Sequence, residues 1–174
     1  MRSTGIVRRI DELGRVVIPK EIRRTMRIKE GEELEVFTTE DALILKKFSA
    51  VKEMVDFNVD YVKSIYLSTG LTAIITDKEK ILAVAGDFKQ YKVGAHYTVK
   101  GERLLEERRI KSLNGIEVTS LFGEDISEVG GMVLSPIVVN GDVMGAVIVV
   151  SKRMLNELSV KTAETASCFL AKRL

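Results

Sequence analysis

The alternation of apolar and polar residues predicts a hairpin at the start of the chain. Residues 6–10 and 15–18 are rich in Val and Ile, a composition typical of short strands. Residues 11–14 lie between the two runs, and Gly14 can take the positive φ that a tight turn requires.

A short helix and a second hairpin are predicted next. Pro19 suits the first turn of a helix because its φ is fixed and it has no N–H to leave unpaired, so the segment KEIRRTMR after it is expected to be helical. Residues 34–38 and 42–48 are expected to be a third and a fourth strand. All of this lies within fewer than 50 residues, which is too little chain to sustain a core alone, so we expect obligate dimerisation.

Residues 49–70 are predicted to form a helix that connects the two halves of the chain. Ser49 is a candidate N-cap, and no Gly or Pro interrupts the segment before Gly70. Apolar residues recur in it at spacings that put them on one broad face, which packs either on its own domain or on a dimer mate. The members of this face are Val51, Met54, Val55, Phe57, Tyr61, Val62, Ile65 and Tyr66.

Two apolar runs around an Asn-Gly turn form the strongest hairpin signal in the chain. Residues 132–139 and 143–151 flank Asn140-Gly141-Asp142 and are apolar on both faces, which predicts central strands of a sheet that is covered on both sides. Residues 72–77 and 81–85 are expected to be two further strands.

Loops and helices are predicted around this sheet. Residues 86–101 are loop-like, residues 102–111 are expected to be helical, and residues 113–131 are irregular or partly stranded. A last helix is expected over residues 155–174. The apolar residues expected to share one side of it are Leu158, Ala166, Phe169 and Leu170.

Positive charge is concentrated at the start of the chain. Between Arg2 and Lys29, nine basic minus three acidic side chains give +6, whereas the whole chain carries +2. A solvated face usually mixes the two signs, so this concentration predicts a surface for a polyanion, most simply nucleic acid. At about 100° per residue, one side of the predicted helix carries Lys20, Arg23, Arg24 and Arg27, and the opposite side carries Ile22 and Met26. A separate acidic group is expected to face away from the polyanion: Glu30, Glu32, Glu33, Glu35, Glu40 and Asp41.

Residues 3–47, which contain TGIVRRIDELGRVVIPKEIRRT (4–25) and end in ALILKK (42–47), resemble the swapped-hairpin DNA-binding module of the AbrB/MazE/SpoVT superfamily of bacterial transition-state regulators. The resemblance implies that hairpins from two chains exchange to form one intertwined β-barrel dimer, which binds double-stranded DNA with loose sequence preference. It also implies the site. Arg8, Arg15, Arg23 and Arg24 match arginines with which the family contacts DNA, and Arg9, Lys20 and Arg27 are further candidates.

The second half of the chain is similar to a GAF domain in the order of its elements, and SPIVVNGDVMGAVIVVSK resembles the end of the GAF sheet. This resemblance implies that a ligand would lie against the sheet beneath residues 86–130, whose sequence matches no pattern that identifies one. We therefore expect an α+β protein. Its domains would be a swapped-hairpin DNA-binding domain over residues 1–50, a connecting helix over 51–70 that packs with the GAF-like domain, and a GAF-like sensor or oligomerisation domain over 71–174, with an antiparallel sheet flanked by helices.

Catalytic chemistry has little support in the sequence. His96 is the single histidine and Cys168 the single cysteine, and neither has the spacing of a metal site or of a nucleophile with its base. We expect no enzyme, no catalytic residue, no metal and no cofactor. Cys168 is expected to be a small buried group on a helix. The single thiol, the polar N-terminus and the absence of a long apolar run indicate a cytoplasmic protein with no membrane contact.

These observations predict a transcription regulator that binds promoter DNA on the nucleoid, and the resemblance implies activation and repression of sporulation genes. Helices over residues 51–69 and 155–174 could join two dimers into a tetramer. The second domain is either a sensor of an unknown small-molecule effector or a clamp that only assembles subunits. The alternative is an antitoxin-type autoregulator that captures a toxin through its C-terminal half. Antitoxins of this kind usually end in a short disordered tail, whereas this half is long and apolar.

Overall fold

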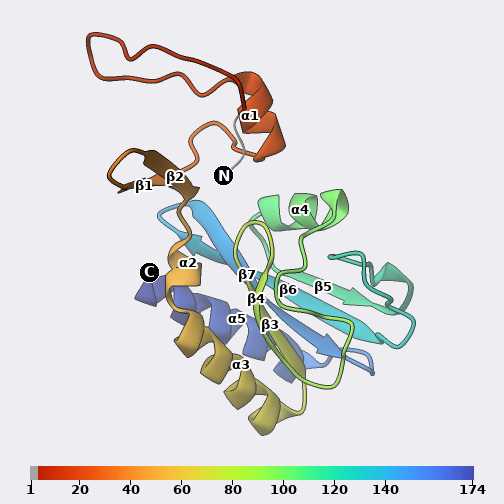
Figure 1. The fold of residues 1–174 in the computed structure, drawn as a ribbon. Coiled ribbons are helices and arrows are strands. Elements are labelled where there is room, and N and C mark those ends of the chain that lie inside the picture. Colours follow the sequence, from red (N-terminus) through yellow and green to blue (C-terminus); the bar gives the residue numbers. More distant parts are fainter. Residues whose placement is uncertain (1–3) are drawn as a thin grey trace. The chain divides into compact units, whose positions relative to one another are not determined.

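A computed structural model describes residues 4–174 and divides the chain into two compact units, one ending at Phe48 and one beginning at Ser49 (Figure 1). Arg2, which is part of the basic segment, lies outside the described residues. Among the described residues, every helix falls short of the length and apolarity that crossing a bilayer demands.

The first unit contains one helix and one hairpin that confirm the sequence predictions. Helix α1 spans Lys20–Thr25 and begins directly after Pro19. Strands β1 (Leu34–Thr38) and β2 (Leu43–Lys47) pair antiparallel. The amide of Phe48 still donates to the carbonyl of Glu33 at 3.0 Å, so the hairpin is hydrogen-bonded up to the end of the unit.

Residues 5–18, which we call the arm, form an extended loop and not the two strands that the sequence predicts. The amide of Asp11 donates to the carbonyl of Arg15, and the amide of Gly14 donates to that of Asp11, but no ladder continues from this turn. The prediction of strands over 6–10 and 15–18 is therefore wrong for a single chain. A two-stranded hairpin is marginal in water without a surface to pack on. The apolar side chains of the arm lack one: Val7 is 87% exposed, Ile10 69%, Leu13 74%, Val16 51% and Val17 72%.

The second unit is built on a five-stranded antiparallel sheet in the order β4-β3-β7-β6-β5. The predicted hairpin is confirmed as β6 and β7, and its two-residue loop has positive φ at Asn140 (51°) and Gly141 (89°), as a tight hairpin turn requires. The strands are β3 (Thr72–Thr76), β4 (Ile81–Ala85), β5 (Lys111–Asn114), β6 (Gly131–Val139) and β7 (Asp142–Ser151).

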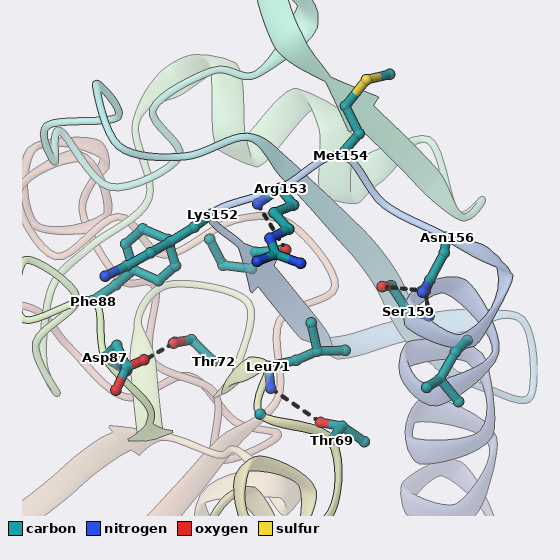
Figure 2. Close-up of a pocket in the computed structure, with 14 residues that line it drawn as sticks. Thr69, Leu71, Thr72, Asp87, Phe88, Lys152, Arg153, Met154, Asn156 and Ser159 are labelled. Carbon is teal, nitrogen blue, oxygen red and sulfur yellow. Dashed lines mark hydrogen bonds between the residues drawn. The ribbon is translucent and has the colours of Figure 1, made fainter.

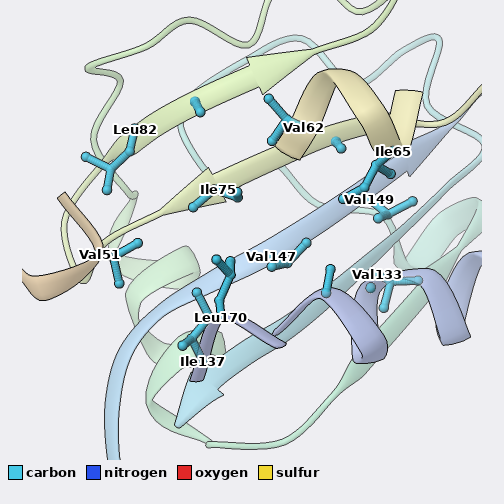
Figure 3. Close-up of a cluster of buried hydrophobic side chains, with 14 residues drawn as sticks. Val51, Val62, Ile65, Ile75, Leu82, Val133, Ile137, Val147, Val149 and Leu170 are labelled. Carbon is cyan, nitrogen blue, oxygen red and sulfur yellow. The ribbon is translucent and has the colours of Figure 1, made fainter. Parts of the chain in front are cut away.

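Helices α2 (Ala50–Glu53), α3 (Val55–Thr69) and α5 (Glu157–Arg173) cover one face of this sheet (Figure 1). The connecting helix of the prediction is thus broken at Met54. The N-cap prediction is confirmed, since the Ser49 hydroxyl oxygen accepts from the amide of Lys52 at 3.3 Å. α3 packs on β3 and β4, and α5 packs on β6 and β7. Figure 3 shows the core between these layers, formed by fully buried side chains that include Val51, Val62, Ile75, Val147, Val149 and Leu170.

The other face of the sheet is covered by helix α4 (Val99–Glu106), by a short 3-10 turn (Gly115–Glu117) and by loops. The prediction that both faces are covered is therefore confirmed. The helix predicted over residues 102–111 is wrong at both ends. It begins at Val99, and it cannot continue past Arg108, whose φ is 56°. Residues from Lys111 onward pair with β6 as the edge strand β5, and this pairing overrides the local helix preference.

Helix α5 corrects two further expectations. Cys168 is exposed and not buried. Leu158 is 59% exposed and Phe169 is 41% exposed, whereas Ala166 and Leu170 are buried as expected. The face that meets the sheet is made mostly of small residues, which let the helix approach closely: Ser159, Ala163, Ala166 and Ser167. The Ser167 hydroxyl lies 2.8 Å from that of Ser135 on β6.

The exposed arm generates a test of dimerisation. If the arm pairs with a second copy of the chain, its amides must be protected from hydrogen exchange, since a single chain hydrogen-bonds few of them. We expect protection of residues 6–10 and 15–18 in the full-length protein and its loss in Val17→Asp, measured by exchange mass spectrometry. Ile116→Asp, at an exposed apolar residue of the second unit, is the matched control and should leave the protection intact. Rapid exchange throughout the arm of the unchanged protein would contradict the dimer.

Candidate nucleic-acid interface

All seven basic side chains predicted to contact DNA are exposed. Arg8 and Arg9 lie on the arm, and Arg15 follows its turn. The remaining four lie on or just after α1: Lys20, Arg23, Arg24 and Arg27.

Most of this charge has no counter-ion. Within residues 4–174, none of the following forms an ion pair with a carboxylate: Arg8, Arg9, Lys20, Arg23 and Arg24. An uncompensated group of guanidinium side chains repels itself, and a phosphate backbone relieves that repulsion while releasing counter-ions. The arrangement is therefore suited to a nucleic acid.

The apolar side of α1 is not covered within a single chain. Ile22 is half-buried, and Met26, at the C-terminal end of the helix, is 52% exposed. The sequence predicts that both residues face a core. Like the arm, this side of α1 has apolar surface that the described residues of one chain do not bury.

Arg15 differs from the other basic residues because a carboxylate holds it. Its Nε donates to Oδ2 of Asp11 at 2.7 Å, and its backbone amide donates to Oδ1 of Asp11 at 2.8 Å. The amide of Leu13 also donates to Oδ1, at 3.0 Å. The backbone and side-chain hydrogen bonds from Arg15 lower the pKa of Asp11 below its usual range, so this carboxylate is ionised at neutral pH. In the sequence, Asp11 is one of three acidic residues that reduce the positive charge of the basic segment, and no pattern there distinguishes it from Glu12.

The acidic group after α1 is partly neutralised inside the first unit. Glu32 lies 3.4 Å from the ammonium group of Lys47 and accepts from the amide of Lys29 at 2.8 Å. The acids lie on β1 and its flanking turns, after the basic elements in the chain.

The second unit has a cleft of about 500 Å³ where α3 leads into β3 and where β7 leads into α5. Figure 2 shows Phe88 and Lys152 on one side, Asn156 and Ser159 on the other, and Arg153 between them. Neither Lys152 nor Arg153 has an ion-pair partner among the described residues. No sequence pattern indicates this cleft, because residues 69–72, 87–88 and 150–159 form it together.

The side of the sheet beneath residues 86–130, where the GAF resemblance implies a ligand, is packed with the chain's own side chains. Tyr91, Tyr97 and Leu121 are at most 4% exposed there. The Tyr97 hydroxyl lies 2.7 Å from that of Thr76, and burial raises the pKa of Tyr97 well above its usual value. His96 lies in the same loop and pairs with Lys80 in an isolated bridge. Among residues 4–174, no three His, Cys, Asp or Glu side chains gather as metal ligands would.

An aromatic group lies on the outer side of α3 and α5. The ring centroids of Phe57 and Tyr61 are 5.4 Å apart, and that of Phe169 lies 6.0 and 5.5 Å from them. The guanidinium of Arg173 lies 4.7 Å over the ring of Phe57. Phe57 and Tyr61 are only half-buried, so this group leaves apolar surface at the seam of the two helices.

Comparison with known proteins identifies the chain's relatives. Residues 53–174 match the family model described as stage V sporulation protein T C-terminal, transcription factor. Stage V sporulation protein T of Bacillus subtilis (strain 168) is 40% identical over 176 residues, which cover 100% of this chain and 99% of that protein. The chain belongs to the stage V sporulation protein T family.

The two units of this stage V sporulation protein T relative have separate likenesses. Residues 7–52 match a family described as antidote-toxin recognition MazE, bacterial antitoxin. The transition state regulatory protein AbrB of Bacillus subtilis (strain 168) is 58% identical over 48 residues, which are 28% of this chain and 50% of that protein. The resemblance of the basic segment to the AbrB/MazE/SpoVT superfamily is thereby confirmed.

The second unit has the fold of a GAF domain. The GAF domain of an Acinetobacter phosphoenolpyruvate-protein phosphotransferase superposes with a TM-score of 0.56 at 15% identity, covering 73% of this chain and 82% of that one. Similarity at this level shows the fold alone. It confirms the predicted α+β class with a GAF-like antiparallel sheet flanked by helices.

Proposed function

We propose that this chain regulates transcription of sporulation genes in the cytoplasm by binding promoter DNA through the arm and α1 of an intertwined dimer. The observation that carries the proposal is the group of exposed basic side chains without counter-ions, on a segment that is 58% identical to AbrB. The relatives are transcription factors and regulators by name, and we propose no enzymatic activity.

The proposed contacting residues are Arg8, Arg15, Arg23 and Arg24, and Arg9, Lys20 and Arg27 are further candidates. Guanidinium groups can bind both phosphate oxygens and the O6/N7 edge of guanine, so the surface can both position the duplex and read it. A two-fold dimer doubles every contact and suits a pseudo-palindromic or repetitive site.

The second unit contributes oligomerisation. An exposed aromatic group at a helix seam is the kind of apolar surface that a second copy of the same helices covers in a two-fold contact. Two dimers joined through α3 and α5 would bring four DNA-binding halves together and raise avidity.

The second unit also offers a position for a small-molecule effector. The expected GAF position is filled, whereas the cleft at Lys152 and Arg153 is open and carries two unpaired cations. A cleft of this size falls in the range of small-molecule sites. We therefore place the effector of the sensor hypothesis in this cleft, and the clamp hypothesis corresponds to a cleft that binds nothing.

The antitoxin alternative has weaker support. The family that matches residues 7–52 is described by an antitoxin, but the same segment is 58% identical to a transition state regulator. The segment available for capturing a toxin is a folded GAF-like unit, not a short tail.

DNA binding should depend steeply on salt. The unchanged protein is expected to lose affinity for a promoter duplex as salt rises, and Arg23→Ala should lower the slope of log K against log salt by about 1 to 2 per dimer, because each dimer loses two phosphate contacts. Alanine at positions 8, 15, 23 and 24 together should abolish binding without unfolding the protein. Lys172→Ala, on α5, is the control and should change nothing. Fluorescence anisotropy across a salt series measures all of these, and binding that is insensitive to salt would refute the proposed surface.

The aromatic group predicts the size of the assembly. Multi-angle light scattering at micromolar concentration is expected to give a tetramer for the full-length protein and a dimer for Phe169→Lys, because an ammonium group next to the Arg173 guanidinium cannot be buried at that seam without a counter-ion. Leu67→Lys, at an 82% exposed residue of α3, should remain tetrameric. A dimer for the unchanged protein would remove the tetramer from the proposal.

An effector should raise the melting temperature by mass action. A ligand at 100 times its Kd stabilises the folded state by about 2.7 kcal/mol. We expect one pool of small organic anions to raise the Tm of the full-length protein, and we expect Arg153→Ala to abolish the shift while Lys172→Ala retains it. No shift with any pool would favour the clamp. A shift that survives Arg153→Ala would move the site away from the cleft.

A further inference from the structure

A single carboxylate organises the turn of the arm. Asp11 accepts three hydrogen bonds: from the amide of Leu13, from the amide of Arg15 and from Nε of Arg15. The amide of Asp11 itself donates to the carbonyl of Arg15 at 3.1 Å. Three of these four bonds join Asp11 to Arg15, so the turn and the arginine side chain are fixed by the same group.

The ion pair leaves the end of the guanidinium free. It occupies Nε, and the two terminal nitrogens of Arg15 make no hydrogen bond within residues 4–174. The Arg15 side chain is 71% exposed. Arg8, Arg23 and Arg24 have no such anchor, so they keep the rotamer freedom that Arg15 has lost.

Neither fold stability nor general DNA affinity explains this carboxylate. Exposed ion pairs contribute little to stability. A negative charge on a surface that binds DNA repels phosphate and weakens binding to every sequence. The turn alone does not require the charge, because an asparagine side chain can accept the same two amide bonds at Oδ1.

A fixed orientation does have a use in base recognition. An unrestrained arginine can settle on any nearby phosphate, and such contacts carry no sequence information. An arginine whose terminal nitrogens are held in one direction has lost its rotamer freedom before it binds, so binding costs less entropy. Its fixed terminal nitrogens form a bidentate contact only at sites where a guanine presents its O6 and N7 atoms to them.

We propose that Asp11 is a positioning residue that holds Arg15 for reading a base edge, so that it raises discrimination between DNA sites while lowering affinity for DNA in general. The inference rests on the proposed DNA-binding function. It assigns the discrimination of the surface to Arg15, and it assigns the sequence-independent part of binding to the unanchored arginines Arg8, Arg23 and Arg24.

The test compares two duplexes on the full-length protein. One is the sequence most enriched when the unchanged protein selects from a random pool, and the other is a scrambled duplex of equal length and composition. The measured quantity is the ratio of the two affinities at one salt concentration. The variants are Asp11→Asn, Arg15→Lys and the two combined. Glu12→Gln removes the same charge from the neighbouring residue, which forms neither a hydrogen bond nor an ion pair with Arg15, and it is the matched control.

Asp11→Asn keeps the acceptor for the turn and loses the ion pair. We expect it to bind the scrambled duplex more tightly and the selected duplex less tightly, so that the ratio falls at least about fivefold, the low end of what a bidentate arginine–guanine contact contributes. Arg15→Lys should lower the ratio similarly, because lysine has no fork to orient. Adding Asp11→Asn to Arg15→Lys should then change the ratio less than about twofold, since the two residues act as one unit. Glu12→Gln should raise both affinities by the same factor and leave the ratio unchanged.

Several results would overturn the proposal. If Asp11→Asn leaves the ratio of the two affinities unchanged, Asp11 has no positioning role. If Asp11→Asn lowers this ratio by the same factor in the Arg15→Lys variant as in the unchanged protein, Asp11 does not act through Arg15. A fall of the same size in Glu12→Gln means that only charge matters. If the unchanged protein binds DNA but enriches no sequence, the positioning role fails while DNA binding stands. If it binds neither duplex, the proposed function fails as well.

Discussion

The structure depends on one constraint: the arm carries more apolar surface than a single chain buries. Five Val, Ile and Leu side chains between residues 7 and 17 are more than half exposed. The apolar side of α1, which follows them in the sequence, is only partly buried. Exposed apolar surface of this kind is normal only where another surface will cover it. Under the proposed function that covering surface is a second copy of the chain, and the stability of the arm and its occupancy of DNA would then both follow protein concentration.

Where the sequence predicted structure correctly, the information is local. Pro19 before α1, Ser49 before α2 and Asn140-Gly141 between β6 and β7 each fix a backbone geometry through their own chemistry. Where it failed, a distant partner decides. Residues 107–111 have the composition of a helix, but the structure ends α4 at Glu106 because β5 pairs with β6, and that pairing is invisible in any short window. The arm is the extreme case, since its apolar side chains are left exposed by the described residues of one chain.

Helix α5 shows why apolar periodicity can indicate the wrong face. The spacing of large apolar residues predicts the side that meets the sheet, but small residues occupy much of that side, because they allow the helix to lie close to β6 and to pair Ser167 with Ser135. Phe169 is then left for the outer seam with α3. The candidate DNA site can be proposed from the sequence, because an excess of basic over acidic residues is visible in the composition of one segment. The proposed role of Asp11 cannot, because it depends on distances to Arg15 that only the structure gives.

The junction between the two units limits how a signal could pass along the chain. The amide of Phe48 still belongs to the first hairpin, and Val51 is already fully buried in the core of the second unit, so only Ser49 and Ala50 separate them. Two hydrogen bonds also hold the break at Met54. The buried side-chain amide of Asn58 donates to the carbonyl of Val51 at 2.7 Å, and the backbone amide of Asn58 donates to the carbonyl of Met54 at 2.8 Å. The connection between the two units is therefore short in sequence, and the start of α3 is held by hydrogen bonds. An effector could act by that route only through a difference in its affinity for the two arrangements of the chain. The C-terminal end of the same α3 lines the cleft at Arg153, which is the position where such a difference in affinity would act on this helix.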